Sequence, residues 1–178
     1  GADDDSLTFN ERITNVTVRG GAARDAISVA ESLDSLVDAG GDNDNLSISG
    51  SHSNLIAKGG EGSDTLTLTL SGTGNKFYAG KDADTITINT SAAVAVHGDD
   101  ENDVITLTGA NSEASVFGGS GADTLNLNAA SASSELFAKG NSGNDSIVGS
   151  ASNDVKATNA AISCINTQAA ESVQVINN

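Results

Sequence analysis

An aspartate recurs at nearly constant spacing along most of the chain, and this repeat restricts the fold more than any other feature. Successive members are 20, 19, 20, 20, 19, 20 and 22 residues apart. The repeated residues are Asp5, Asp25, Asp44, Asp64, Asp84, Asp103, Asp123 and Asp145. A fixed period of this length is typical of proteins in which each repeat is one structural unit that stacks on the next. The repeat therefore predicts a solenoid.

Aliphatic residues keep the same phase as the aspartates. Two residues after each aspartate stands Leu or Ile: Leu7, Ile27, Leu46, Leu66, Ile86, Ile105, Leu125 and Ile147. Four residues after it the apolar residues are Phe9, Val29, Ile48, Leu68, Ile88, Leu107 and Leu127, and only Gly149 breaks this second column. The residues between the columns are mostly small and polar. A period of two with one apolar side is expected of a strand that buries one face.

A second strand is predicted before each acidic loop. Its expected inward pairs are Leu55 with Ala57, Val94 with Val96, and Leu136 with Ala138. Two strands and two turns then form one coil, and parallel coils stack about 4.8 Å apart. The predicted fold is all-β: a single-domain parallel β-roll, or β-solenoid, of about eight coils of 19 to 22 residues. We expect one domain over 1–178, with regular coils over 1–150 and degenerate coils over 151–178.

Composition decides between this solenoid and a disordered acidic chain. The sequence has 24 acidic and 8 basic residues, a net charge of −16, and only five Phe or Tyr with no Trp. Such a composition also occurs in disordered segments, but disorder gives no reason to keep Leu or Ile at one phase of a repeat. The charge argues against nucleic-acid binding, and no apolar run is long enough to predict membrane insertion. The partner that the charge implies is a cation.

The loops before the aspartates carry glycines in a fixed pattern. They read Gly-Gly-Glu-Gly-Ser-Asp over 59–64, Gly-Gly-Ser-Gly-Ala-Asp over 118–123, and Gly-Asn-Ser-Gly-Asn-Asp over 140–145. This pattern resembles the nonapeptide G-G-x-G-x-D-x-U-x of the RTX (repeats-in-toxin) family, in which calcium lies between adjacent loops of a β-roll. A glycine-rich turn can point its carbonyl oxygens at an ion, and calcium takes six to eight oxygen ligands.

The resemblance implies Ca²⁺ as the cofactor, about seven ions in one row. The implied metal-site residues are Asp3, Asp5, Asp25, Gly40, Asp42, Asp44, Gly60, Gly62, Asp64, Gly80, Asp82, Asp84, Asp99, Glu101, Asp103, Gly119, Gly121, Asp123, Gly143 and Asp145. Seven Ca²⁺ ions would bring roughly +14, which nearly offsets the net charge, so folding is expected to depend on calcium.

Several loops depart from the family pattern. Asp3, Asp42, Asp82 and Glu101 stand where the family prefers Gly, and each could be a further ligand or lie in solvent. Arg24, next to Asp25, predicts a weak or empty site. The turns opposite the acidic loops carry almost no carboxylates, so ions are expected along one edge only.

The two ends of the repeat lack polar caps. The chain begins without Met and enters directly on an acidic loop, while Glu171 to Val175 repeat the loop-to-strand phase. A degenerate strand is expected over 161–165, with Cys164 in the core. Uncapped ends have two explanations: a segment of a longer chain, or head-to-tail stacking into a homopolymer.

No catalytic constellation is evident, and an enzyme is not predicted. His52 and His97 lie far apart in the repeat, and neither is expected beside a Ser or Cys with an orienting acid. The leading hypothesis is an extracellular, calcium-dependent structural protein of a bacterial surface layer, matrix fibre or adhesin.

Two alternatives assign a ligand to the strand faces. Ice binding would use the outward Thr65, Thr67, Thr85 and Thr87, but Asn45, Val104, Asn126 and Val148 interrupt these ranks. Carbohydrate or host-surface adhesion would use exposed aromatic residues, but Tyr78, Phe117 and Phe137 are not expected to form one column.

Overall fold

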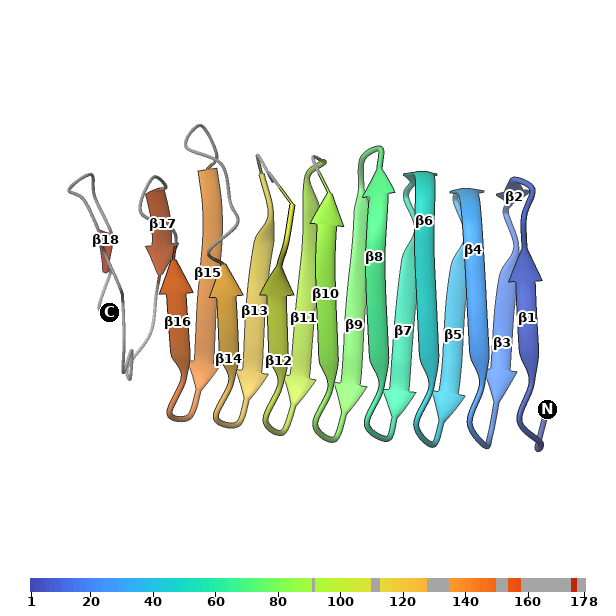
Figure 1. Cartoon of the computed structure of the whole chain (residues 1–178), viewed down its shortest axis with the longest axis horizontal. Coiled ribbons are helices and arrows are strands. Elements are labelled where there is room, and N and C mark those ends of the chain that lie inside the picture. The colour runs from blue at the N-terminus through green and yellow to red at the C-terminus, as the bar shows by residue number, and fades with distance from the viewer. Residues whose placement is uncertain (91, 110–112, 128–134, 150–153, 158–173, 176–178) are drawn as a thin grey trace.

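The chain folds as a parallel β-solenoid whose strands alternate between two long sheets (Figure 1). The structure is a computed structural model, and it describes residues 1–90, 92–109, 113–127, 135–149, 154–157 and 174–175. No helix occurs in these ranges. The predicted fold class is therefore confirmed.

The first sheet is formed by the strands that follow the acidic loops. In spatial order they are β1 (Ser6–Phe9), β4 (Ala26–Leu33), β6 (Asn45–Ser53), β8 (Thr65–Ser71), β10 (Thr85–Thr90), β12 (Val104–Leu107), β14 (Thr124–Leu127) and β16 (Ser146–Gly149). The short β2 (Ile13–Thr14) pairs with β4 beside this path.

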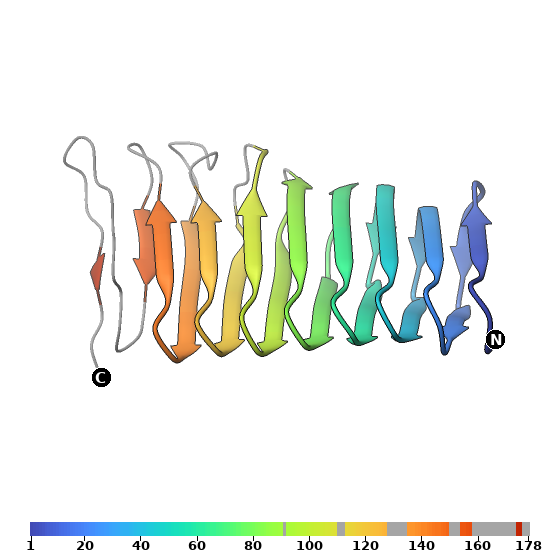
Figure 2. The same cartoon turned by 60° about the horizontal axis from the view of Figure 1, so that its bottom comes forward.

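The second sheet is formed by the strands that lead into the loops. They are β3 (Thr17–Gly21), β5 (Leu36–Gly41), β7 (Ile56–Glu61), β9 (Asn75–Lys81), β11 (Val94–Asp100), β13 (Ser115–Ser120), β15 (Glu135–Ser142), β17 (Asp154–Ala157) and β18 (Gln174–Val175). The two sheets run side by side along the solenoid, and the acidic loops join them along one edge (Figure 2).

Register places equivalent residues of successive coils directly beside one another. Leu46 pairs with Leu66, and Leu66 pairs with Ile86. Leu68 and Ile88 are matched in the same way two residues later. From the second coil onward the described members of both aliphatic columns are buried, whereas Leu7 and Phe9 of the first coil are only partly buried. Because each coil covers its neighbour, the first coil leaves part of its core exposed at its outer end.

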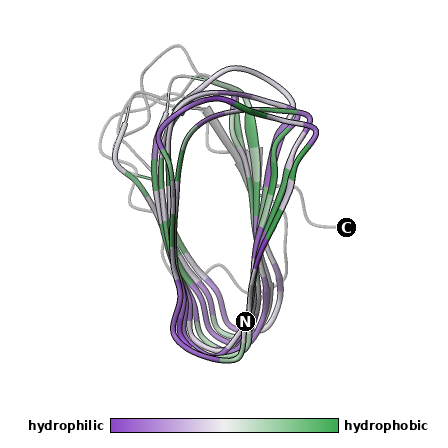
Figure 3. Cartoon of the chain, turned by 90° about the vertical axis from the view of Figure 1, so that its right-hand side faces the viewer, coloured by the Kyte–Doolittle hydropathy of each residue, from purple (hydrophilic) through white to green (hydrophobic). Residues whose placement is uncertain are grey.

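The second sheet supplies the other wall of the core. Each predicted inward pair is buried: Leu55, Ala57, Val94, Val96, Leu136 and Ala138. Phe77 is the largest fully buried side chain of this sheet. Seen along the solenoid axis, the coils superimpose, and the loop end of their cross-section is largely hydrophilic (Figure 3). The sequence pattern therefore located both faces of the core.

The C-terminal region was predicted to hold degenerate coils. Two short strands, β17 and β18, pair in parallel there and continue the second sheet. The expected strand over 161–165 and Cys164 lie outside the described residues.

Candidate metal centre

The repeated aspartates form a column inside the solenoid, which we call the aspartate column. Its members are Asp5, Asp25, Asp44, Asp64, Asp84, Asp103, Asp123 and Asp145. From Asp25 to Asp145 the exposed fractions are only 1 to 3%. Each aspartate lies two residues before an inward Leu or Ile, so the alternation of the strand turns its side chain inward as well. Asp5, in the first coil, is half-buried and lies 3.2 Å from the N-terminal amine.

One carboxylate oxygen of each inner aspartate ties two coils together. Oδ1 accepts a hydrogen bond from the backbone N–H of the aspartate in the preceding coil. The Asp44 N–H donates to Asp64 at 2.7 Å, and the Asp64 N–H donates to Asp84 at 2.6 Å. The same bond recurs from Asp5 to Asp145, at 2.6 to 3.1 Å. These side chains therefore satisfy loop amides that the sheets leave unpaired.

The second carboxylate oxygen is buried without a hydrogen-bond partner among the described residues. The atoms are Oδ2 of Asp25, Asp44, Asp64, Asp84, Asp103 and Asp123. A buried polar atom without a partner costs about 1 to 3 kcal/mol, and more when it is charged. A regular row of them along one edge is a pattern that needs a physical explanation.

Glycines leave room for these oxygens. A Cβ built on Gly59 would lie 2.2 Å from Oδ2 of Asp64 and 2.5 Å from the carbonyl oxygen of Ala79 in the next coil. Gly20 and Gly118 have the same surroundings in their own coils. A carboxylate oxygen of one coil and a backbone carbonyl of the next thus face the same small space.

Burial raises the pKa of these carboxyl groups in the metal-free fold. Loss of water, aided by the neighbouring carboxylates, raises the pKa of Asp64 and of Asp103 to about 7 and that of Asp84 to about 8. The pKa values of Asp44 and Asp123 rise for the same reasons. The hydrogen bonds from the backbone act in the opposite direction but are weaker than burial.

This donor set suits a hard cation. Calcium takes carboxylate and carbonyl oxygens in flexible geometry, and both kinds of oxygen converge here. In the part of the chain that the structure describes, no group of three or more His, Cys, Asp or Glu side chains converges on one point. Backbone carbonyls would therefore have to supply much of the coordination, as the glycine-rich loops allow.

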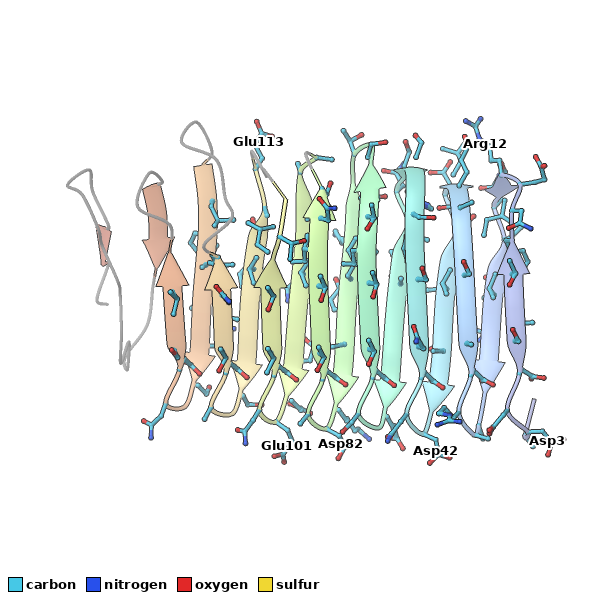
Figure 4. All side chains as sticks on the ribbon, in the orientation of Figure 1. Asp3, Arg12, Asp42, Asp82, Glu101 and Glu113 are labelled. Carbon is cyan, nitrogen blue, oxygen red and sulfur yellow. The ribbon has the colours of Figure 1, made fainter. Side chains whose placement is uncertain are left out.

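The second carboxylates of the loops lie apart from the column. Asp3, Asp42, Asp82 and Glu101 are exposed and project from the outer side of the loops (Figure 4). Asp99 is half-buried and lines a hollow on the second sheet. These residues can shape the potential around the edge, whereas the buried oxygens belong to the column.

Arg24 was expected to weaken the site of Asp25. Its side chain is exposed, and its backbone N–H donates to Asp4 at 3.2 Å. Asp25 itself is buried and keeps both the Oδ1 hydrogen bond and the unpartnered Oδ2 of the other coils. The weaker site at this loop stays a prediction.

Two loop positions require a left-handed backbone. The first, four residues before each aspartate, is Gly21, Gly40, Gly60, Gly80, Asp99, Gly119 and Asn141, all with positive φ. The second, two residues before it, is Ala23, Asp42, Gly62, Asp82, Glu101, Gly121 and Gly143, again with positive φ. The predicted glycines thus allow the turn, and the non-glycine members adopt it at a cost of about 1 kcal/mol or more each.

Gly60→Ala is expected to lower the free energy of unfolding by about 2 to 4 kcal/mol, measured by thermal denaturation in calcium. Gly60 has φ +127°, and a Cβ there would lie 2.0 Å from the carbonyl oxygen of Gly40. Gly41→Ala is the matched control, because a Cβ there would lie 4.0 Å from the carbonyl oxygen of Gly21 and its backbone is not left-handed. Equal stability of the two variants would contradict this account of the loops.

His52 occupies the setting of a core residue. His52 is fully buried, and its Nδ1 lies 2.8 Å from the Ser32 hydroxyl. Its Nε2 donates to the Ser49 carbonyl at 2.9 Å rather than to an acid. Burial lowers the pKa of His52. Among the described residues, the hydrogen-bond partners of His52 are thus a serine hydroxyl and a backbone carbonyl.

The outer face of the second sheet carries an aromatic column that the sequence analysis missed. Tyr78 stacks on His97 with ring centroids 4.9 Å apart, and His97 stacks on Phe117 at 4.5 Å. Phe137 follows in a tilted contact at 5.6 Å. Tyr78 and Phe117 therefore share one column through His97, whereas Phe137 pairs with Ser115 and lies outside this register, so Tyr78, Phe117 and Phe137 do not form one register column, as expected. The missing member was His97, which joins Tyr78 to Phe117.

Hydroxyl groups line part of the outer face of the first sheet. Thr65 pairs with Thr85, and Thr67 pairs with Thr87. These rows of hydroxyl side chains are interrupted as expected, because the residue that pairs with Thr85 in the next coil is Val104, which is 42% exposed. This face therefore lacks an unbroken hydroxyl array.

Comparison with known proteins gives the chain no relative: no family model, no curated protein and no solved structure matches it. Within the described residues no helix could span a membrane. The class that the fold and the site define is a parallel β-solenoid with a column of buried aspartates along one edge.

Proposed function

We propose that this chain is an RTX-like calcium-binding structural module in which a row of Ca²⁺ ions completes the fold. The observation that carries the proposal is the row of buried Oδ2 atoms that have no hydrogen-bond partner among the described residues. Bound Ca²⁺ supplies the positive charge that allows these carboxylates to stay ionised inside the solenoid. The residues proposed to hold it are the aspartate column and the backbone carbonyls beside Gly20, Gly59 and Gly118.

Charge balance supports a row rather than a single ion. The net charge is −16, and stacking places each buried carboxylate next to the same group in the coils above and below. At about 5 Å and an effective dielectric near 20, each such pair of charges repels by about 3 kcal/mol. One ion between each pair of coils removes this repulsion along the whole edge.

The setting that suits such a protein is the exterior of a bacterial cell. Sites of this type in extracellular modules work at about 10⁻⁴ to 10⁻³ M calcium, far above cytosolic levels. A chain that folds only at such concentrations would become rigid after export. Folding on calcium after export suits a component of a surface layer, a matrix fibre or an adhesin.

Head-to-tail assembly is the second part of the proposal. Among the described strands, β1 and β3 are the end strands of their sheets and have a strand neighbour on one side only. In the same coil Leu7 and Phe9 are incompletely covered, and Asp5 is half-buried. A second copy stacked on this end would pair both strands and bury these side chains. Sedimentation velocity with calcium should reveal oligomers, and a strictly monomeric calcium-loaded protein would contradict assembly.

Calcium counting tests the central proposal. Equilibrium dialysis against millimolar Ca²⁺ is expected to give about seven ions per chain, because about seven gaps separate eight aspartates. Mg²⁺ at the same concentration is the control and should bind far fewer sites, since it demands tighter octahedral geometry and keeps its water. Binding of fewer than about three Ca²⁺ ions would reject the row.

A further inference from the structure

A hollow opens on the outer face of the second sheet, away from the aspartate column. Its volume is about 350 Å³. It spans β7, β9 and β11, and its lining includes Ile56, Lys58, Gly60, Tyr78, Gly80 and Asp99. Gly60, Gly80 and Asp99 are among the metal-site residues that the sequence pattern implied, but the hollow opens on the outer face, whereas the unpartnered oxygens of the aspartate column are buried.

The backbone builds the hollow into the sheet. Gly60 and Gly80 are paired in register, so two adjacent coils contribute no side chain at this level. A Cβ on Gly80 would lie 2.1 Å from the carbonyl oxygen of Gly60, and the φ of Gly80 is +124°. Because neither position accepts a side chain, the floor of the hollow stays open.

Tyr78 lines this hollow. It is the first ring of the aromatic column, and His97 stacks on one face of it at 4.9 Å with an interplanar angle of 17°. The residue paired with Tyr78 on the open side is Lys58, and Ile56, which is 38% exposed, stands two residues before Lys58. An apolar wall therefore borders the glycine floor.

Two opposite charges flank that wall. Burial raises the pKa of the Asp99 carboxyl group, and the nearby His97 and, with a smaller effect, Lys58 act in the opposite direction. Asp99 pairs with Gly80 in the sheet, and Lys58 pairs with Tyr78. The hollow thus offers a ring face, a hydrogen-bond donor and a hydrogen-bond acceptor, with no net charge from the two groups.

We propose that this hollow is a binding site for a neutral pyranose saccharide. A pyranose ring has an apolar C–H face, which fits against an aromatic ring, and hydroxyl groups around its rim. Tyr78 and Ile56 would take the apolar face, Asp99 would accept hydrogen bonds from hydroxyl groups, and Lys58 would donate to hydroxyl oxygens. Small-molecule sites of this kind combine a mostly apolar wall with a few placed polar groups.

The balance of charge favours this ligand over others. A metal ion would need more carboxylates than Asp99 alone, and an anionic ligand would meet the acidic surface of a chain with net charge −16. The proposal rests on the fold and not on the calcium row, so either can fail without the other.

Intrinsic fluorescence can test the site directly. Tyr78 is the only tyrosine, and the chain has no tryptophan, so tyrosine emission reports on this hollow alone. In calcium-containing buffer, titration with neutral glucose, mannose and N-acetylglucosamine oligosaccharides should change the emission saturably with at least one of them. No change with any oligosaccharide up to about 10 mM, the weak limit for such small sites, would overturn the proposal. Emission that instead follows protein concentration would assign the face to a second copy and also overturn it.

Substitutions of residues that line the hollow test whether the saccharide binds there. By calorimetry, Tyr78→Ala and Asp99→Asn should each weaken saccharide binding about tenfold or more. Tyr78→Phe keeps the ring and should retain binding. Phe117→Ala is the matched control, because Phe117 belongs to the same aromatic column but does not line the hollow. Equal loss in Phe117→Ala, or unchanged binding in Tyr78→Ala with normal far-UV circular dichroism, would overturn the site.

Discussion

At pH 8, removal of calcium with a chelator is expected to unfold most of this solenoid, and the same metal-free protein at pH 5 is expected to regain β structure. The pKa values of the folded, metal-free state are the reason: burial raises Asp64 and Asp103 to about 7 and Asp84 to about 8. In the unfolded chain an aspartate has a pKa of about 3.9. Far-UV circular dichroism across this pH range, with and without chelator, measures the effect.

The sign follows from proton linkage. Between about pH 4 and pH 7 the folded state binds more protons than the unfolded state, so metal-free stability falls as pH rises. The contribution is fully present below pH 3.9 and is lost as pH rises through 7 to 8, and each pKa unit is worth at most about 1.4 kcal/mol for each group. Several coupled groups act in the same direction. A metal-free protein that is as folded at pH 8 as at pH 5 would contradict the buried column.

Calcium should remove this dependence above neutral pH. A bound cation holds the carboxylates in their ionised form, so the calcium-loaded protein should keep constant ellipticity from pH 7 to pH 9. Addition of Mg²⁺ to the chelated protein at pH 8 is the control and should restore little β structure. Full recovery with Mg²⁺ would show that charge alone, and not oxygen coordination, stabilises the edge.

Most of the fold could be predicted from the repeat, because the sequence pattern of one coil occurs eight times. Leu66 and Leu68 keep the phase of Asp64, so period and alternation together located the core from the sequence alone. The same alternation also indicates that the aspartates are buried, since Asp64 lies two residues before Leu66 and therefore points to the same side of the strand. The sequence pattern does not distinguish the two carboxylate oxygens. The structure shows that Oδ1 accepts a hydrogen bond from a backbone amide, whereas Oδ2 has no hydrogen-bond partner among the described residues.

The aromatic column depended on exact register, which coil length obscures. Tyr78, His97 and Phe117 are 19 and 20 residues apart, whereas the next coil is longer, so Phe117 pairs with Lys139. Phe137 is therefore displaced by two positions and packs at a tilt. His97 is not an aromatic residue of the Phe or Tyr type, so a search for exposed Phe and Tyr did not include it in the column. Register in a repeat of variable length is set by the opposite turns, and their sequences are the least regular part of the chain.

Asp64→Asn is expected to change stability with opposite signs in the two metal states. With calcium, the variant should bind about one or two ions fewer and unfold about 2 kcal/mol more easily, since a charged ligand is replaced by an amide. With chelator at pH 8 it should be more stable than the parent chain, because it no longer buries a carboxylate whose pKa is raised to about 7. Thermal melts in both buffers, with calcium counted by dialysis, give both signs.

Asp64→Ala separates the role of charge from that of the hydrogen bond. Asn keeps an acceptor for the Asp44 N–H, which donates to Oδ1 of Asp64 at 2.7 Å, whereas Ala leaves this buried amide without a partner. Ala should therefore be less stable than Asn by about 1 to 3 kcal/mol in both buffers. Asp25→Asn is the matched control beside Arg24 and should remove fewer ions than Asp64→Asn. If Asp64→Asn instead destabilised the chelated protein as much as the calcium-loaded one, the buried carboxylate would be acting as a hydrogen-bonding group alone, and the case for a metal row would fail.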